Sequence, residues 1–102
     1  MSNIRKAQEA LVARVLKGDG RASHALRRAA FDNVGLEEPL LKLLRKVAER
    51  AHTVTDEDVA AVRAAGLSED QIFELVVCAA IGEASRQHDA ALGALHAAAG
   101  RK

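Results

Sequence analysis

The chain has very little cysteine and very few aromatic residues: one cysteine, two phenylalanines, and no tryptophan or tyrosine among 102 residues. A single cysteine excludes a disulfide within the chain, so nothing in the sequence calls for an oxidising compartment. Apolar residues still make up 49% of the chain, so Leu, Val and Ala must fill the core. Small aliphatic side chains of this kind suit the packing of helix against helix.

The chain also lacks an excess of either charge and a long apolar run. Fifteen Lys and Arg face fourteen Asp and Glu, a formal net charge of +1, which is too small for bulk attraction to nucleic acid or an anionic membrane. The longest apolar run, residues 75–82, is far shorter than a membrane span. The start MSNIRKAQEA shows no apolar signal core. We therefore expect a cytoplasmic protein that binds neither nucleic acid nor membrane.

Helical periodicity dominates what is present, and no segment alternates as a strand would. Five amphipathic or apolar segments are predicted as helices, the first behind a cap at Ser2 or Asn3, and the last residues, HAAAGRK, are expected to fray. The length is ordinary for one domain. The sequence therefore predicts an all-α, single-domain bundle of about five helices over residues 1–102. The predicted helices cover about residues 4–16, 22–33, 40–51, 56–65 and 69–95.

Local signals mark the ends of these helices. The glycines of KGDG (residues 17–20) and Gly35 are predicted to end helices, and Pro39 fits only a first turn. Thr55 precedes an acidic run, and Ser68 with Gln71 fits a capping box, so both mark helix starts. Residues 72–81 are apolar almost all round, which predicts that the first half of the last helix lies at the centre of the fold.

Cys78 lies in this apolar helix, one turn after Glu74. A carboxylate beside a thiol raises the thiol pKa, where a redox nucleophile needs it lowered. Activation would require help from another element, for instance His24 or His52. We therefore interpret Cys78 as a small apolar residue in a buried helix, with a redox nucleophile as the alternative.

Glu74 is costly to bury without a partner. An ion pair with an Arg or Lys is the favoured interpretation, with Arg45 and Arg86 as candidates, and a catalytic base is the alternative. The four histidines show no spacing typical of metal ligands, so no metal and no cofactor are predicted.

The segment VTDEDVAAVRAAGLSEDQIFELVVCAAIGEASRQHDAAL, within residues 40–95, resembles the alkylhydroperoxidase-D-like and carboxymuconolactone-decarboxylase-like superfamily. The resemblance consists of an acidic helix start, a Gly-Leu-Ser hinge with acidic residues, and a long apolar helix. It implies an all-helical fold that associates into dimers, trimers or hexamers, in which helices of neighbouring subunits complete the core.

Redox-active members of this superfamily carry a Glu-x-x-x-Cys-x-x-Cys-x-x-x-His signature. Glu74 and Cys78 match its first two positions, whereas Ile81 and Ser85 stand where the second cysteine and the histidine would be. The dithiol cycle therefore cannot run within one chain. The lead-in to this helix looks more like the segment before the family's later, non-catalytic helix, and in this favoured alignment the match of Glu74 and Cys78 is coincidental. The decarboxylase branch relies on a histidine, and His88 is the residue that aligns loosely with it.

The leading hypothesis is a non-catalytic member of this superfamily, a helical homo-oligomer with a structural or ligand-binding role. A helix that is apolar on all sides needs more cover than four short helices supply, which also favours a second subunit. One alternative is an enzyme, either a one-cysteine thiol peroxidase using Cys78 or a decarboxylase-like lyase using His88. A protein-protein interaction module is the other alternative.

Overall fold

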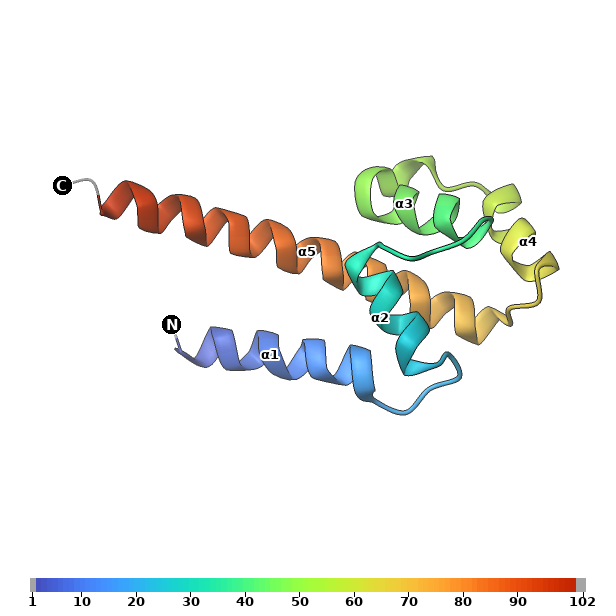
Figure 1. The fold of residues 1–102 in the computed structure, drawn as a ribbon, viewed down its shortest axis with the longest axis horizontal. Coiled ribbons are helices and arrows are strands. Elements are labelled where there is room, and N and C mark those ends of the chain that lie inside the picture. Colours follow the sequence, from blue (N-terminus) through green and yellow to red (C-terminus); the bar gives the residue numbers. More distant parts are fainter. Residues whose placement is uncertain (1, 101–102) are drawn as a thin grey trace.

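The computed structural model describes residues 2–100, with side chains from residue 5 onward. Helices make up 79% of the structure, and the part described contains no strand. The prediction of an all-α bundle with about five helices is confirmed (Figure 1). The elements in chain order are α1 (Ser2–Lys17), α2 (His24–Asp32), α3 (Leu40–Arg50), the short 3-10 helix η1 (Ala51–Thr53), α4 (Asp56–Ala64) and α5 (Glu69–Ala99).

The long helix α5 is the axis of the molecule. Helices α2, α3 and α4 gather around its first half, while α1 runs back along its second half and leaves the last turns of α5 extending beyond every other helix (Figure 1). The molecule is accordingly elongated, with extents of 55 × 28 × 21 Å. Among the described residues, no helix is both long enough and apolar enough to span a bilayer.

The core lies where α2, α3, α4 and the first half of α5 meet. The prediction that this half of α5 is central is confirmed, because Ile72, Leu75 and Ala79 are buried. Phe73 on the same segment nevertheless remains 69% exposed. The largest fully buried side chains are all aliphatic or cysteine, as the low aromatic content requires: Leu43, Leu44, Leu75, Val62 and Cys78.

Two of the predicted helix starts form capping boxes. The Thr55 hydroxyl accepts the Asp58 N–H at the start of α4, and the Ser68 hydroxyl accepts the Gln71 N–H at the start of α5. In each box the later side chain accepts the N–H of the capping residue in return, which satisfies two otherwise unpaired donors. The expected cap of α1 at Ser2 or Asn3 falls on side chains outside those described.

Of two predicted helix ends, one is confirmed with a different capping residue and the other was wrong. Helix α2 ends at Asn33, as predicted, but Asn33 caps the helix in place of Gly35, because Asn33 adopts the left-handed conformation (φ 55°) and its side-chain amide donates to the main-chain oxygen of Leu44 at 3.1 Å. Helix α5 continues through Ala99, where fraying was expected. The run of alanines explains this, since alanine has the highest helix propensity.

Helices α2 and α5 touch main chain to main chain at Gly82. A Cβ atom at this position would collide with the main-chain oxygen of Phe31, at the end of α2. The same oxygen accepts a hydrogen bond from the Arg86 guanidinium at 2.7 Å. Glycine is therefore required at Gly82 for the close crossing of the two helices.

Candidate functional site

The carboxylate of Glu74 is bound by main-chain N–H groups of the loop between α1 and α2. The N–H of Arg21 donates to both carboxylate oxygens, at 2.9 and 2.8 Å, and the N–H of Ala22 donates at 2.8 Å. The predicted ion pair with Arg45 or Arg86 is therefore wrong. Arg86 instead binds Phe31 and Glu83, and the partner of Glu74 is a turn of the backbone.

Gly20 allows this turn to reach Glu74. A Cβ atom at Gly20 would lie 2.7 Å from the Glu74 carboxylate, closer than real Cβ contacts come. The KGDG segment is thus a turn, as the sequence indicates, and it leads directly into the two residues that bind Glu74. The main-chain N–H groups of Arg21 and Ala22, directly after this segment, form the kind of concave donor site that binds an anion, here a carboxylate of the same chain.

Arg27 binds the same loop through its carbonyl groups. It is buried, and its guanidinium donates to the main-chain oxygens of Gly18 at 2.6 Å and Ala22 at 3.1 Å. A longer bond of 3.4 Å reaches the oxygen of Val15, near the end of α1. These oxygens include helix-end acceptors that lack partners within the helix. Sequence patterns did not single out Arg27, because its partners are main-chain atoms and carry no side-chain signal.

These contacts keep the Glu74 carboxyl ionised and engage both of its oxygens in hydrogen bonds. The N–H groups of Ala22 and Arg21, with the charge of Arg27, hold the pKa of the Glu74 carboxyl below its ordinary value. A general base needs a raised pKa and a free oxygen aimed at a substrate. The pKa of the Glu74 carboxyl is lowered instead of raised, and both of its oxygens already accept the N–H of Arg21.

Cys78 is 1% exposed, and its thiol lies 3.5 Å from the main-chain oxygen of Val15, as a weak donor. Burial raises the pKa of the Cys78 thiol, and the charge of Arg27 offsets only part of this rise. The thiol is therefore protonated at neutral pH and closed to solvent, as expected for a small residue of the core. Both properties oppose the attack of a thiolate on a peroxide.

The structure does not bring a histidine to Cys78. The shallow groove beside Cys78, of about 140 Å³, is lined by residues of α1, α2, α5 and the first loop, and these include no histidine. His24 and His52 are both exposed. His88 is also exposed, on α5, and lines a different groove beside Ser85 and Gln8. The predicted candidates Glu74 and Cys78 thus lie together, whereas His88 stands apart from them.

A buried carboxylate that the sequence patterns did not single out, Asp58, joins α3 to α4. Asp58 is 7% exposed and binds the Lys46 ammonium at 2.7 Å and the Thr55 N–H at 3.0 Å. The Lys46 hydrogen bond, followed by the Thr55 N–H, lowers the pKa of Asp58 to about 2. This pair ties the start of α4 to α3, which is a structural role.

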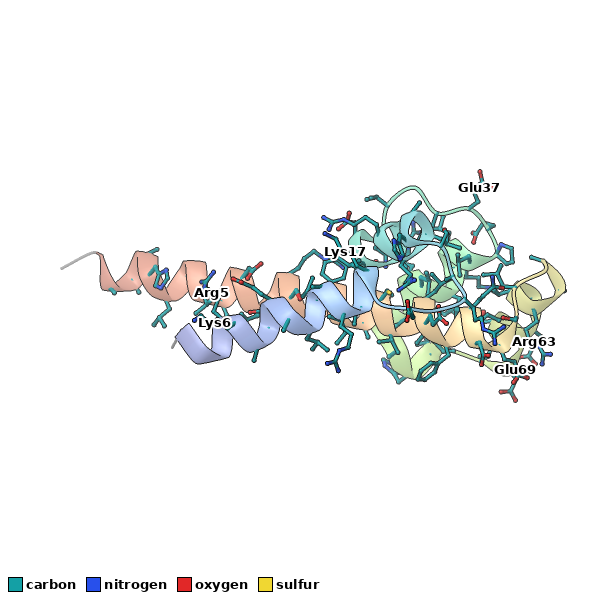
Figure 2. The ribbon with its side chains drawn as sticks, turned by 90° about the horizontal axis from the view of Figure 1, so that it is seen from below. Arg5, Lys6, Lys17, Glu37, Arg63 and Glu69 are labelled. Atoms are coloured by element: carbon teal, nitrogen blue, oxygen red, sulfur yellow. The ribbon has the colours of Figure 1, made fainter. Side chains whose placement is uncertain are left out.

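Two open grooves flank the line where α1 meets α5. One, of about 350 Å³, lies between the Leu11 side of α1 and residues 81–88 of α5. The other, of about 480 Å³, lies on the opposite side of α1 and reaches Phe31 of α2; Arg5, on an early turn of α1, lines it (Figure 2). Within the part of the chain described, no three His, Cys, Asp or Glu side chains are grouped to hold a metal ion.

The candidate site is therefore an anchor for the loop between α1 and α2, in which Glu74 and Cys78 of α5 and Arg27 of α2 all bind main-chain atoms of residues 15–22. Its chemistry must be inferred from these contacts. Comparisons of the chain with protein-family models, with curated proteins and with solved structures found no match.

Proposed function

We propose that the chain is a cytoplasmic, non-catalytic helical protein that acts as a structural homo-oligomer, and that it is a small member of the alkylhydroperoxidase-D-like superfamily. One observation carries the non-catalytic part. Glu74 and Cys78, the two residues that match the redox signature, direct their polar atoms at the main chain of residues 15–22. In this proposal the match to the signature is coincidental, and the two residues form a structural anchor.

The geometry supports neither enzymatic alternative. A one-cysteine peroxidase needs an accessible thiolate, whereas Cys78 is buried and its pKa is raised. A lyase centred on His88 needs a second group to orient or ionise the imidazole. His88 is exposed beside a groove, and among the described residues its side chain makes no hydrogen bond or ion pair.

The exposure of α5 supports self-association. From Ala84 onward this helix is exposed at almost every position, and Leu95 is 62% exposed. Leu11 on the adjacent face of α1 is 46% exposed. A projecting helix with uncovered leucines is typical of a surface that is buried against another molecule.

Light scattering coupled to size-exclusion chromatography tests the oligomer. We expect a mass of at least twice the 10.8 kDa of the chain; a mass of one chain at micromolar concentration would refute the proposal. Peroxide consumption with an added dithiol reductant tests the absence of catalysis. The rates with wild type and with Cys78→Ser should not exceed that of the reductant alone. Turnover by wild type that Cys78→Ser abolishes would restore the peroxidase.

Ligand binding is a second candidate, supported by the groove of about 480 Å³. Its floor is apolar, and its rim carries more basic than acidic side chains, a combination that suits an organic acid with an apolar body. Decanoate is a suitable probe by titration calorimetry, and Lys17→Glu should weaken its binding. Equal heats with and without the protein would remove this candidate. The lining includes Val12, Leu16, Phe31, Arg5, Lys17, Arg28, Arg86, Glu9 and Asp89.

A further inference from the structure

The second half of α5 carries a regular stripe of five apolar residues and one histidine. Its positions recur alternately three and four residues apart, which is the spacing of a coiled-coil seam. The first position is half-buried beside α1 and all the others are exposed. Within the described structure no other element covers these exposed positions. The stripe consists of Ile81, Ala84, His88, Ala91, Leu95 and Ala98.

Large and small residues alternate along this stripe. Ile81, His88 and Leu95 are large, and an alanine follows each of them three residues later. A second copy lying parallel would set each residue against itself, giving layers of two alanines next to a layer of two histidines. Cores pack at near-crystal density, so such layers would leave voids beside crowded contacts.

An antiparallel second copy removes this mismatch. Centred between His88 and Ala91, it places His88 against Ala91 of the other copy and Ala84 against Leu95 of the other copy. The outermost layer then joins Ile81 to Ala98. Every layer contains one large residue and one alanine, so the stripe is complementary to itself in this one orientation.

The groove between α1 and α5 can accommodate Leu95 of the second copy. It measures about 350 Å³, and Ala84 lies among its lining residues with Leu11 and Ile81. In the antiparallel arrangement Leu95 of the second copy lies opposite Ala84, at this groove. Leu95 and Leu11, two of the large apolar side chains that are most exposed in one chain, would then cover each other.

The distribution of charge favours a copy of the chain over a membrane surface. Between residues 81 and 99 the charged side chains are Glu83, Arg86 and Asp89, and none of them lies on the stripe. Two stripes therefore meet without burying an unpaired charge. A helix that lies on a membrane carries many Lys and Arg on its polar face, whereas this segment has only Arg86.

We propose that a second copy of this chain docks antiparallel along the second half of α5, with Leu95 of each copy seated at Ala84 of the other. The inference rests on the proposed homo-oligomer and specifies its interface. Helices α1 of the two copies flank the pair, which makes the interface a four-helix arrangement.

Cross-linking in a Cys78→Ser background tests the register. Ala84→Cys and Leu95→Cys are made separately, and each is treated with a short bis-maleimide, alone and after the two are refolded together. In the proposed register the two copies of either single cysteine lie about 16 Å apart along the axis, at 1.5 Å per residue. We therefore expect a cross-linked dimer from the mixture and none from either variant alone.

Each other result contradicts the inference. Cross-linking of Ala84→Cys alone would show a parallel pair. No cross-link from the mixture, with an oligomeric mass retained, would overturn this interface but leave the proposed homo-oligomer standing. A single-chain mass for wild type would overturn both, and a partner helix from another protein would then be the occupant of the stripe.

Leu95→Glu tests the interface without cysteines. Leu95 is 62% exposed, so its replacement leaves the fold of one chain intact, which the circular dichroism spectrum verifies. We expect the dissociation constant of the oligomer to rise at least about tenfold, because a central apolar anchor is lost. Phe73→Glu is the matched control, since Phe73 is 69% exposed on the same helix but outside the stripe. Equal effects of the two substitutions would contradict the proposal.

Discussion

Glu74 and Arg27 bind the same loop through opposite sets of main-chain groups. The Glu74 carboxylate accepts the N–H groups of Arg21 and Ala22, and the Arg27 guanidinium donates to the carbonyl oxygens of Gly18 and Ala22. The loop that joins α1 to α2 is thereby held to α5 on one side and to α2 on the other. A residue pattern that suggests redox chemistry thus has a structural use in this chain.

Loss of the Glu74 carboxylate should destabilise the fold. Glu74→Ala leaves the N–H groups of Arg21 and Ala22 without their acceptor, and we expect the free energy of unfolding to fall by about 2–3 kcal/mol. Glu74→Gln keeps one acceptor oxygen, so its free energy of unfolding should fall less. Urea denaturation measures both. Glu69→Ala is the control: its exposed pair with Arg63 (Figure 2) should contribute less than about 1 kcal/mol. Equal losses for Glu74→Ala and Glu69→Ala would contradict the anchor.

Asp58 should make stability depend on pH in the acid range. Its folded pKa of about 2 lies below the ordinary value of 3.8, so its ionised form stabilises the fold. This contribution is complete above the ordinary pKa and is lost as the pH falls through about 2. Asp58→Asn should therefore be less stable than wild type at pH 7, and its stability should fall less than that of wild type on acidification.

Thermal melts between pH 7 and pH 2 test this prediction. The melting temperature of Asp58→Asn should still fall somewhat with pH, because the pKa values of Glu74 and Glu83 are also lowered. Wild-type and Asp58→Asn curves that stay parallel over the whole range would contradict the assignment.

Two glycines of α5 provide a matched test of the crossing with α2. Gly82→Ala would drive a methyl group into the main chain of Phe31, so we expect a loss of about 3 kcal/mol. At Gly93 a Cβ atom has no neighbour within 4 Å. Gly93→Ala should therefore stabilise the helix by about 0.5–1 kcal/mol. Melting temperatures that move in the same direction for both variants would show that the crossing is not as close as described.

The helices were predictable because their signals are local. Thr55 and Ser68 cap helices through groups within three residues of themselves, and apolar periodicity marks the faces that become buried. The end of α2 was predicted, but the capping role of Asn33 was missed because its side-chain amide reaches Leu44 across the fold. Such a contact depends on tertiary packing and leaves no local pattern.

The partner of Glu74 could not be predicted for a related reason. The sequence indicated that a carboxylate in an apolar helix needs a partner, and charged side chains such as Arg45 and Arg86 were the visible choices. The structure uses main-chain N–H groups, which every non-proline residue carries and which no sequence pattern distinguishes. Only Gly20, which permits the close approach, marks the place in the sequence.

The reactivity of the Cys78 thiol in the native protein tests the structural account most directly. The thiol is buried and its pKa is raised, so a disulfide reagent reaches it only after local opening of the fold. We predict that the native protein at pH 7 reacts at least about 100-fold more slowly than the chain unfolded in urea. A native thiol that reacts as fast as the unfolded one, with an apparent pKa below about 8.5, would contradict the account and make Cys78 a functional nucleophile.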